Sequence, residues 1–143
     1  MRTVNACLIG AVLALGSVAC NKADGDKSSE MAVSVAKLTV EQLAEKLESE
    51  APPSVFDANG DSTREKFGTI PGAKLLDSSS GYDVKAMLPG DQDTDLVFYC
   101  ANTRCSAAEG AAERAVEAGY KKVSVLPQGI SGWVEAGQPT NKI

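Results

Sequence analysis

The feature that most constrains the fold is an uninterrupted apolar run, Leu96-Val97-Phe98-Tyr99, which ends at Cys100. A strand with apolar side chains on both of its sides fits the centre of a parallel sheet that is covered on both faces. A short polar loop follows, and Ser106 then stands where a helix is expected to begin. Strand, short loop and helix in succession are the repeating unit of such sheets.

Strand and helix signals alternate along the rest of the chain. Strands are expected at 31–35 (an edge strand), 54–58, 74–76 and 123–126, and helices at 40–49, 62–67, 83–88, 106–118 and 129–136. Capping-box spacing predicts the helix starts at Thr39 and Ser106, and Gly119 is expected as a left-handed helix end. Gly110, inside a predicted helix, is interpreted as allowing a close approach of helix and sheet. The sequence therefore predicts an α/β fold with a mostly parallel central sheet flanked by helices on both faces.

The first 19 residues have the pattern of a signal peptide. Arg2 provides a short positive start, and the apolar stretch at 6–14 is shorter than the roughly 20 residues that a bilayer-spanning helix needs. The segment Ser17-Val18-Ala19-Cys20 resembles the lipobox of bacterial lipoproteins, in which the cysteine is acylated and becomes the mature N-terminus. Ser17 stands where that family usually has Leu, Val or Ile, so ordinary signal cleavage that leaves a free Cys20 is the alternative.

Residues 21–30 are polar and charged and cannot bury a core, so we expect a flexible tether. The expected organisation is a lipoprotein signal peptide at 1–19, a lipid-anchored tether at 20–30 and one folded domain at 31–143. A palmitate-type chain on Cys20 would hold the domain on a bacterial membrane, facing the periplasm. Asn21 after the cysteine favours the outer membrane, by analogy with the lipoproteins of enteric bacteria.

Composition excludes several classes of function. The formal net charge is −5 and the basic residues form no run, so the chain is a poor nucleic-acid binder. The sequence contains no histidine, which removes Ser-His-Asp and Cys-His catalysis and the commonest zinc ligand. Cys7 leaves with the signal peptide, so Cys100 and Cys105 are the thiols of the folded domain, in an oxidising compartment. We expect a monomer without a metal or an organic cofactor.

Cys100 has a chemically meaningful position. Ligands of open α/β sheets bind at the carboxyl ends of the strands, and Cys100 follows the central strand directly. The N–H groups of the loop and of the next helical turn offer partial positive charge. This field is predicted to favour the thiolate of Cys100 and to hold an anion, or a persulfide anion, beside it.

Four segments, in the right order and at the right separations, resemble the rhodanese family. They are Val55-Phe56-Asp57-Ala58, Gly68-Thr69-Ile70-Pro71-Gly72-Ala73, Tyr99-Cys100 with its loop, and Gly129-Ile130-Ser131-Gly132-Trp133. The resemblance covers Leu38 to Pro139 and implies that Cys100 is the persulfide-forming nucleophile. It also implies a substrate-binding backbone cradle made by Ala101, Asn102, Thr103, Arg104 and Cys105. The implied function is a sulfurtransferase or sulfane-sulfur carrier with a thiosulfate-like donor anion and a thiophilic acceptor.

The details of the loop separate this family from its relatives. The loop, counted from the nucleophile, has the six residues of rhodaneses, whereas the related Cys-x5-Arg phosphatases need arginine where this chain has Ser106. Cys105 stands where many active rhodaneses carry Arg or Thr, Thr69 where His is frequent, and Asn59 where Arg is frequent. Arg104 offers a local cation one residue early.

Two interpretations of Cys105 remain open at this stage. In one, Cys105 attacks a persulfide or sulfenate on Cys100 and leaves a disulfide; in the other, it only packs against the helix. The rival function is accordingly a non-catalytic rhodanese-fold binding module, or a thiol–disulfide redox module with Cys100 and Cys105 joined. Asp57 is interpreted as capping the following turn rather than tuning the site, and Trp133 as a packing anchor.

Overall fold

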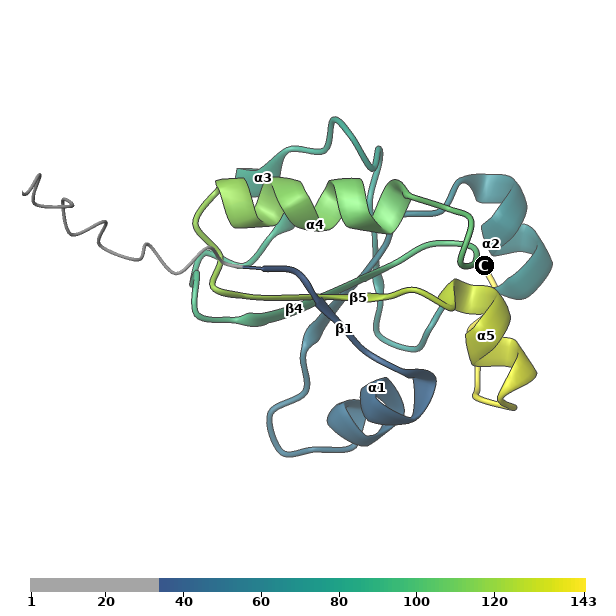
Figure 1. Ribbon diagram of the computed structural model, residues 1–143. Coiled ribbons are helices and arrows are strands. Elements are labelled where there is room, and N and C mark those ends of the chain that lie inside the picture. Colours follow the sequence, from purple (N-terminus) through teal and green to yellow (C-terminus); the bar gives the residue numbers. More distant parts are fainter. Residues whose placement is uncertain (1–33) are drawn as a thin grey trace, which may run out of the picture. The chain divides into compact units, whose positions relative to one another are not determined.

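The computed structural model describes residues 34–143, which form five strands and five helices (Figure 1). The elements are β1 (Ala36–Lys37), α1 (Val40–Leu47), β2 (Ser54–Asp57), α2 (Asp61–Phe67), β3 (Lys74–Leu75), α3 (Val84–Met87), β4 (Asp95–Tyr99), α4 (Ala107–Glu117), β5 (Lys122–Leu126) and α5 (Gly129–Glu135). The predicted signal peptide, the tether and Cys20 lie outside the described residues. Within these residues, no helix has both the length and the apolar character needed to cross a membrane.

The five strands form one sheet in the order β1-β5-β4-β2-β3, and every neighbouring pair is parallel. The apolar run that ends at Tyr99 is the central strand β4, as predicted. Tyr99 lies level with Asp57 of β2 and with Leu126 of β5. The carboxyl ends of the three central strands therefore meet at one edge of the sheet, and the α/β prediction is confirmed.

The first strand lies later in the chain than predicted. It was expected at 31–35, of which 31–33 lie outside the described residues, but β1 spans Ala36–Lys37 and pairs with Ser124 and Val125 of β5. Val35 instead packs against the core. The strand does occupy a sheet edge, as expected.

Side chains of the central strand alternate between two apolar layers. Phe98 and Cys100 belong to the core on one face, where α3 and α4 pack, and Val97 and Tyr99 to the core on the other, where α1 and α5 pack (Figure 1). This alternation is the two-residue period of an extended strand. It sends Cys100 toward α4 and its neighbour Tyr99 to the opposite side of the sheet.

One of the two predicted capping boxes forms. Thr39 accepts a hydrogen bond from the Gln42 N–H at 3.3 Å, and Gln42 Oε1 accepts one from the Thr39 N–H at 2.9 Å. The box predicted at Ser106 is wrong, because the Ser106 side chain caps no amide. Its backbone, at φ −93° and ψ 5°, has left the extended conformation that a capping side chain needs.

Of the two glycine predictions for α4, the one at the end of the helix is confirmed and the one in its interior is wrong. Gly119 ends the helix as predicted, with φ +96° and its N–H donating to the Val116 carbonyl at 2.9 Å. The interpretation of Gly110 is wrong, since a Cβ added there would meet no atom within 4 Å. The helix approaches the sheet through its small alanines instead, namely Ala108, Ala111, Ala112 and Ala115.

Candidate active site

Cys100 is the first residue after β4 and is only 2% exposed. Its side chain lies in the core layer that contains Ala108 in the first turn of α4. The Cys100 sulfur donates a hydrogen bond to the Cys105 carbonyl oxygen at 3.0 Å. The six-residue loop therefore closes back over the thiol with which it begins.

Asn102 shapes this loop. Its carbonyl accepts the N–H of Cys105, and its side-chain oxygen accepts the N–H of Arg104, both at 3.0 Å. These two amides of the predicted cradle are thus used inside the loop. Thr103 and Arg104 are exposed, in contrast to the buried Cys100.

The charge state of Cys100 differs from the prediction. The pKa of the Cys100 thiol is raised to about 12, mainly by burial and in smaller part by the neighbouring Cys105. The main-chain N–H groups of Ala108 and Ala101 act on the same sulfur and lower its pKa. The expected donors are present, but loss of water around a 2% exposed sulfur outweighs them. The expectation of a resting thiolate is therefore wrong.

Cys105 is close to Cys100 and also packs against the core. Its half-buried side chain packs against the apolar layer that contains Cys100, and its carbonyl accepts the hydrogen bond of the Cys100 thiol. Both cysteines are free thiols in this structure. The packing interpretation of Cys105 and its proximity to the nucleophile are therefore compatible.

Helix α5 holds the loop from the other side of the sheet edge. Ile130 N–H donates to the Cys100 carbonyl at 2.8 Å, and Ser131 N–H donates to the Ala101 carbonyl at 3.0 Å. Gly129 makes this approach possible, because its φ is +59° and an added Cβ would lie 2.3 Å from the Cys100 oxygen. Sequence reasoning missed this role of α5, although Gly129 opens one of the recognised segments.

The buried carboxylate of Asp57 lies at the same edge of the sheet, where it bonds to Tyr99 of the α1 and α5 face. It accepts hydrogen bonds from the Tyr99 hydroxyl at 2.6 Å and from the Asn59 N–H at 2.7 Å. The second bond closes the turn after β2, which confirms the capping interpretation of Asp57. The Tyr99 hydroxyl in turn accepts the Ile70 N–H at 3.1 Å. Burial, together with the Asp57 charge, raises the pKa of Tyr99 above its ordinary range, so this hydroxyl stays protonated.

Arg64 completes this network and was missed in the sequence. Its Nε lies 3.5 Å from Asp57 Oδ1, and its Nη2 donates to the carbonyls of Asp57 and Leu76 at 3.1 and 3.0 Å. The guanidinium is buried although it comes from a short helix. One signal for this contact was available in the sequence. Arg64 lies in the first helix after the strand that ends at Asp57, and Asn59 occupies the position where the family frequently has an arginine.

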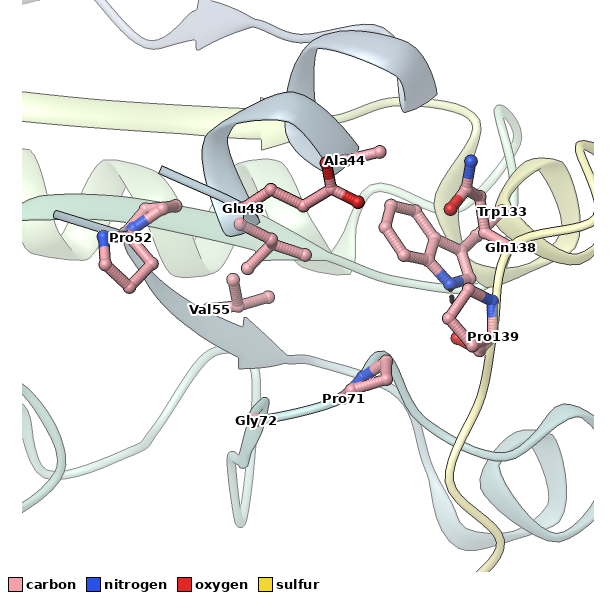
Figure 2. Close-up of a pocket in the computed structure, with 11 residues that line it drawn as sticks. Ala44, Glu48, Pro52, Val55, Pro71, Gly72, Trp133, Gln138 and Pro139 are labelled. Atoms are coloured by element: carbon pink, nitrogen blue, oxygen red, sulfur yellow. Dashed lines mark hydrogen bonds between the residues drawn. The ribbon is translucent and has the colours of Figure 1, made fainter. Parts of the chain in front are cut away.

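A mostly apolar groove lies elsewhere on the domain (Figure 2). It has a volume of about 410 Å³ and is lined by residues of α1, α5, the start of β2 and the turn at 71–72. Trp133 lines it while only 2% exposed, with its indole N–H donating to the Pro139 carbonyl at 2.8 Å. This burial confirms the packing role of Trp133. Cys100 is not among the lining residues.

Among residues 34–143, no group of three or more His, Cys, Asp or Glu side chains could hold a metal ion.

Comparison with solved structures gives the same fold. The rhodanese-like domain of an Anabaena protein is 23% identical with a TM-score of 0.63, over 77% of this chain and 81% of that one. A thiosulfate sulfurtransferase from Pseudomonas aeruginosa is 21% identical with a TM-score of 0.62, over 76% of this chain and 20% of that one. A Rhodopseudomonas palustris protein of unknown function, described as a possible tyrosine phosphatase, is 24% identical with a TM-score of 0.60, over 75% and 85%.

At these identities the likeness establishes the fold alone. Comparison with curated proteins gives no match. The rhodanese-like domain family matches residues 39–136, which contain nine of the ten elements and the whole of the Cys100 loop. The chain belongs to the rhodanese-like domain family.

Proposed function

We propose that the protein is a sulfurtransferase or sulfane-sulfur carrier that forms a persulfide on Cys100. The observation that carries this proposal is a buried cysteine at the carboxyl end of the central strand, with the N–H groups of Ala101 and Ala108 acting on its sulfur. These groups lower the pKa of the thiol, so they stabilise negative charge on that sulfur once it forms. The same donors suit the anionic outer sulfur of a persulfide.

The chemistry is two successive displacements at sulfur. Cys100, after losing its proton to solvent, attacks the outer sulfur of a thiosulfate-like donor; a new S–S bond forms, the donor's S–S bond breaks, and sulfite leaves with the electron pair. A thiophilic acceptor then attacks the outer sulfur of the persulfide and restores the Cys100 thiolate. Neither displacement uses a metal or an organic cofactor.

The high pKa of Cys100 decides how this reaction depends on pH. At neutral pH only a small fraction of the thiol is ionised, although a thiolate of high pKa is a strong nucleophile. Loading with sulfur should therefore accelerate as pH rises. Cys100 is buried in this structure, so the loop that covers it has to shift before a donor can reach the sulfur.

The loop favours sulfur over phosphate as the ligand. Ser106 is exposed and stands where the Cys-x5-Arg phosphatases need arginine, and the amides of Arg104 and Cys105 are already bonded within the loop. Few donors remain for the three oxygens of a phosphate group. This supports the sulfurtransferase proposal over the activity suggested for the Rhodopseudomonas relative.

The test is the intact mass of the reduced protein after exposure to thiosulfate. Shortly after mixing, we expect the wild type to have gained one sulfur atom, with release of sulfite, and Cys100→Ser to show neither. Ser106→Ala, a change next to the loop at a side chain that caps no amide, is the matched control and should gain the sulfur. If thiosulfate and other sulfane donors neither add sulfur to the wild type at any time nor release their leaving group, the rival assignment as a binding or redox module replaces this one.

We also propose that the domain is a monomer tethered through an acylated Cys20 to a bacterial membrane, most simply the outer membrane, and faces the periplasm. The support is the lipobox-like segment and the polar stretch at 21–30. The test is labelling of growing cells with a radioactive fatty acid. Label on the parent protein but not on Cys20→Ser is the expected result, and absence of label from the parent protein would defeat the anchor proposal.

A further inference from the structure

The two thiols of the domain lie together in one loop. The Cys100 sulfur bonds to the carbonyl oxygen of Cys105 at 3.0 Å, so it rests against the backbone of the second cysteine. The half-buried side chain of Cys105 also packs against the apolar layer to which Cys100 belongs. A Cys105 side chain directed into solvent would not pack against this layer.

The loop's own hydrogen bonds maintain this arrangement. The carbonyl of Asn102 accepts the N–H of Cys105, which folds the chain into a turn that brings Cys105 back over Cys100. Helix α5 fixes the other end of the loop by binding the carbonyls of Cys100 and Ala101. Of the two thiols, Cys105 is the more exposed, since Cys100 is only 2% exposed.

We propose that Cys105 is the resolving thiol of the Cys100 persulfide, an inference that rests on the proposed function. Cys105 loses its proton and attacks the inner sulfur, Sγ of Cys100; the Sγ–Sγ bond forms and the bond to the outer sulfur breaks. The outer sulfur leaves with the electron pair and takes up the proton as hydrosulfide. The sulfane sulfur is reduced to sulfide, and the two cysteines are oxidised to a disulfide, so no external oxidant is consumed.

This step gives the protein a place in a reaction sequence. The disulfide form cannot accept another sulfur, so a dithiol reductant has to attack it and regenerate both thiols, becoming a disulfide itself. Cys105, as the more exposed sulfur, is the point at which such a reductant enters. The partner class is therefore a thiol–disulfide oxidoreductase with two cysteines, and the released product is hydrosulfide.

The experiment measures sulfite and sulfide from the same sample. The purified protein is reduced, freed of reductant under nitrogen and mixed with thiosulfate; both products are trapped with a bromobimane and counted. Sulfite reports loading of Cys100 and sulfide reports resolution, so their ratio is independent of the loading rate. Cys105→Ser and Cys105→Ala are compared with the wild type, and Ser106→Ala is the matched control.

We expect about one sulfide per sulfite from the wild type and from Ser106→Ala, and a ratio at least about ten-fold lower from both Cys105 variants, which should retain the added sulfur in their intact mass. The spent wild type should resist alkylation at Cys100 and Cys105 until it is reduced. Sulfite without sulfide from the wild type, with the added sulfur retained, overturns the resolving role and leaves the proposed function standing. Absence of sulfite from every protein overturns the proposed function itself.

Discussion

Tyr99 and Cys100 are consecutive residues, yet they occupy two very different buried environments. Tyr99 lies on the side of α1 and α5, where its hydroxyl bridges the Asp57 carboxylate and the Ile70 N–H, while Arg64 partners the same carboxylate. Cys100 lies on the side of α4, where its thiol donates to the Cys105 carbonyl and the N–H groups of Ala101 and Ala108 act on the sulfur. The buried polar groups on one face of the sheet edge are thus held by several hydrogen bonds, and the other face holds a weakly bonded sulfur.

The difference separates what holds the loop from what can react in it. Removing a member of the Asp57 network takes a hydrogen-bond or ionic partner away from a buried group, which is costly. A thiol is a weak hydrogen-bonding group, so changing the protonation or the bonding of Cys100 costs the fold little. The face with the Asp57 network can therefore serve as the rigid support, and the face with Cys100 can serve as the chemical site.

The largest expected effect is on stability, from Asp57→Ala. Arg64 would keep only the exposed Asp61 carboxylate, 3.3 Å from its Nη1, as a counter-ion. The Tyr99 hydroxyl and the Asn59 N–H would also lose their acceptor, and the combined cost is about 3–5 kcal/mol in the free energy of unfolding. The matched change on the other face, Cys100→Ala, should cost about 1 kcal/mol, since it removes one small apolar atom. Urea unfolding of the two variants measures both values. Equal losses would mean that the two faces do not differ as described.

A somewhat smaller loss is expected from Gly129→Ala. An alanine with φ near +59° is strained, and its Cβ would collide with the Cys100 carbonyl, so we expect a loss of about 3 kcal/mol. Gly110→Ala is the matched control, because it adds the same methyl group where no atom lies within 4 Å, and it should stabilise the protein by about 1 kcal/mol. The two thermal midpoints, measured side by side, should move in opposite directions.

The reactivity of Cys100 should rise with pH. Only the thiolate is alkylated, and a pKa of about 12 means that its fraction grows about ten-fold for each pH unit below that value. The rate of iodoacetamide addition to Cys100, read from the mass of its peptide, should therefore rise about 100-fold from pH 7 to pH 9 without levelling off. A plateau below pH 9 would show that the sulfur is a thiolate at rest.

The smallest effect is expected from Tyr99→Phe. The change removes the hydroxyl that bridges Asp57 and the Ile70 N–H, at a cost of about 2 kcal/mol, while the ring keeps its packing. Because the Arg64 contacts with Asp57 remain, the loss should be smaller than that of Asp57→Ala. Chemical unfolding of the two variants checks the order, and a Tyr99→Phe protein as stable as the wild type would remove Tyr99 from the support.

Most of the fold could be predicted because it depends on local patterns. The run at 96–99, the cap at Thr39 and the left-handed Gly119 are each decided within a few residues, and the structure has them as expected. Two of the misses depend on how a segment packs against the rest of the domain. The register of β1 is decided by β5, and Gly110 was misjudged because the alanines beside it, not the glycine, face the sheet.

The site divides in the same way. The position of Cys100 and the length of its loop could be read from the sequence, since both lie within one short segment. The Arg64 contact with Asp57 and the grip of α5 on the loop could not, because each joins residues from separate elements. The pKa direction was wrong for a related reason: the N–H donors are local, whereas burial of the sulfur is produced by the whole core.

The most direct test of the central claim is to locate the transferred sulfur. The reduced wild-type protein is mixed with thiosulfate, quenched in acid after a short and a long interval, alkylated and digested, and the peptide that spans Cys100 and Cys105 is sequenced by mass spectrometry. We predict an extra sulfur on Cys100 at the short interval. An extra sulfur confined to Cys105, or none on this peptide at any time, would contradict the account.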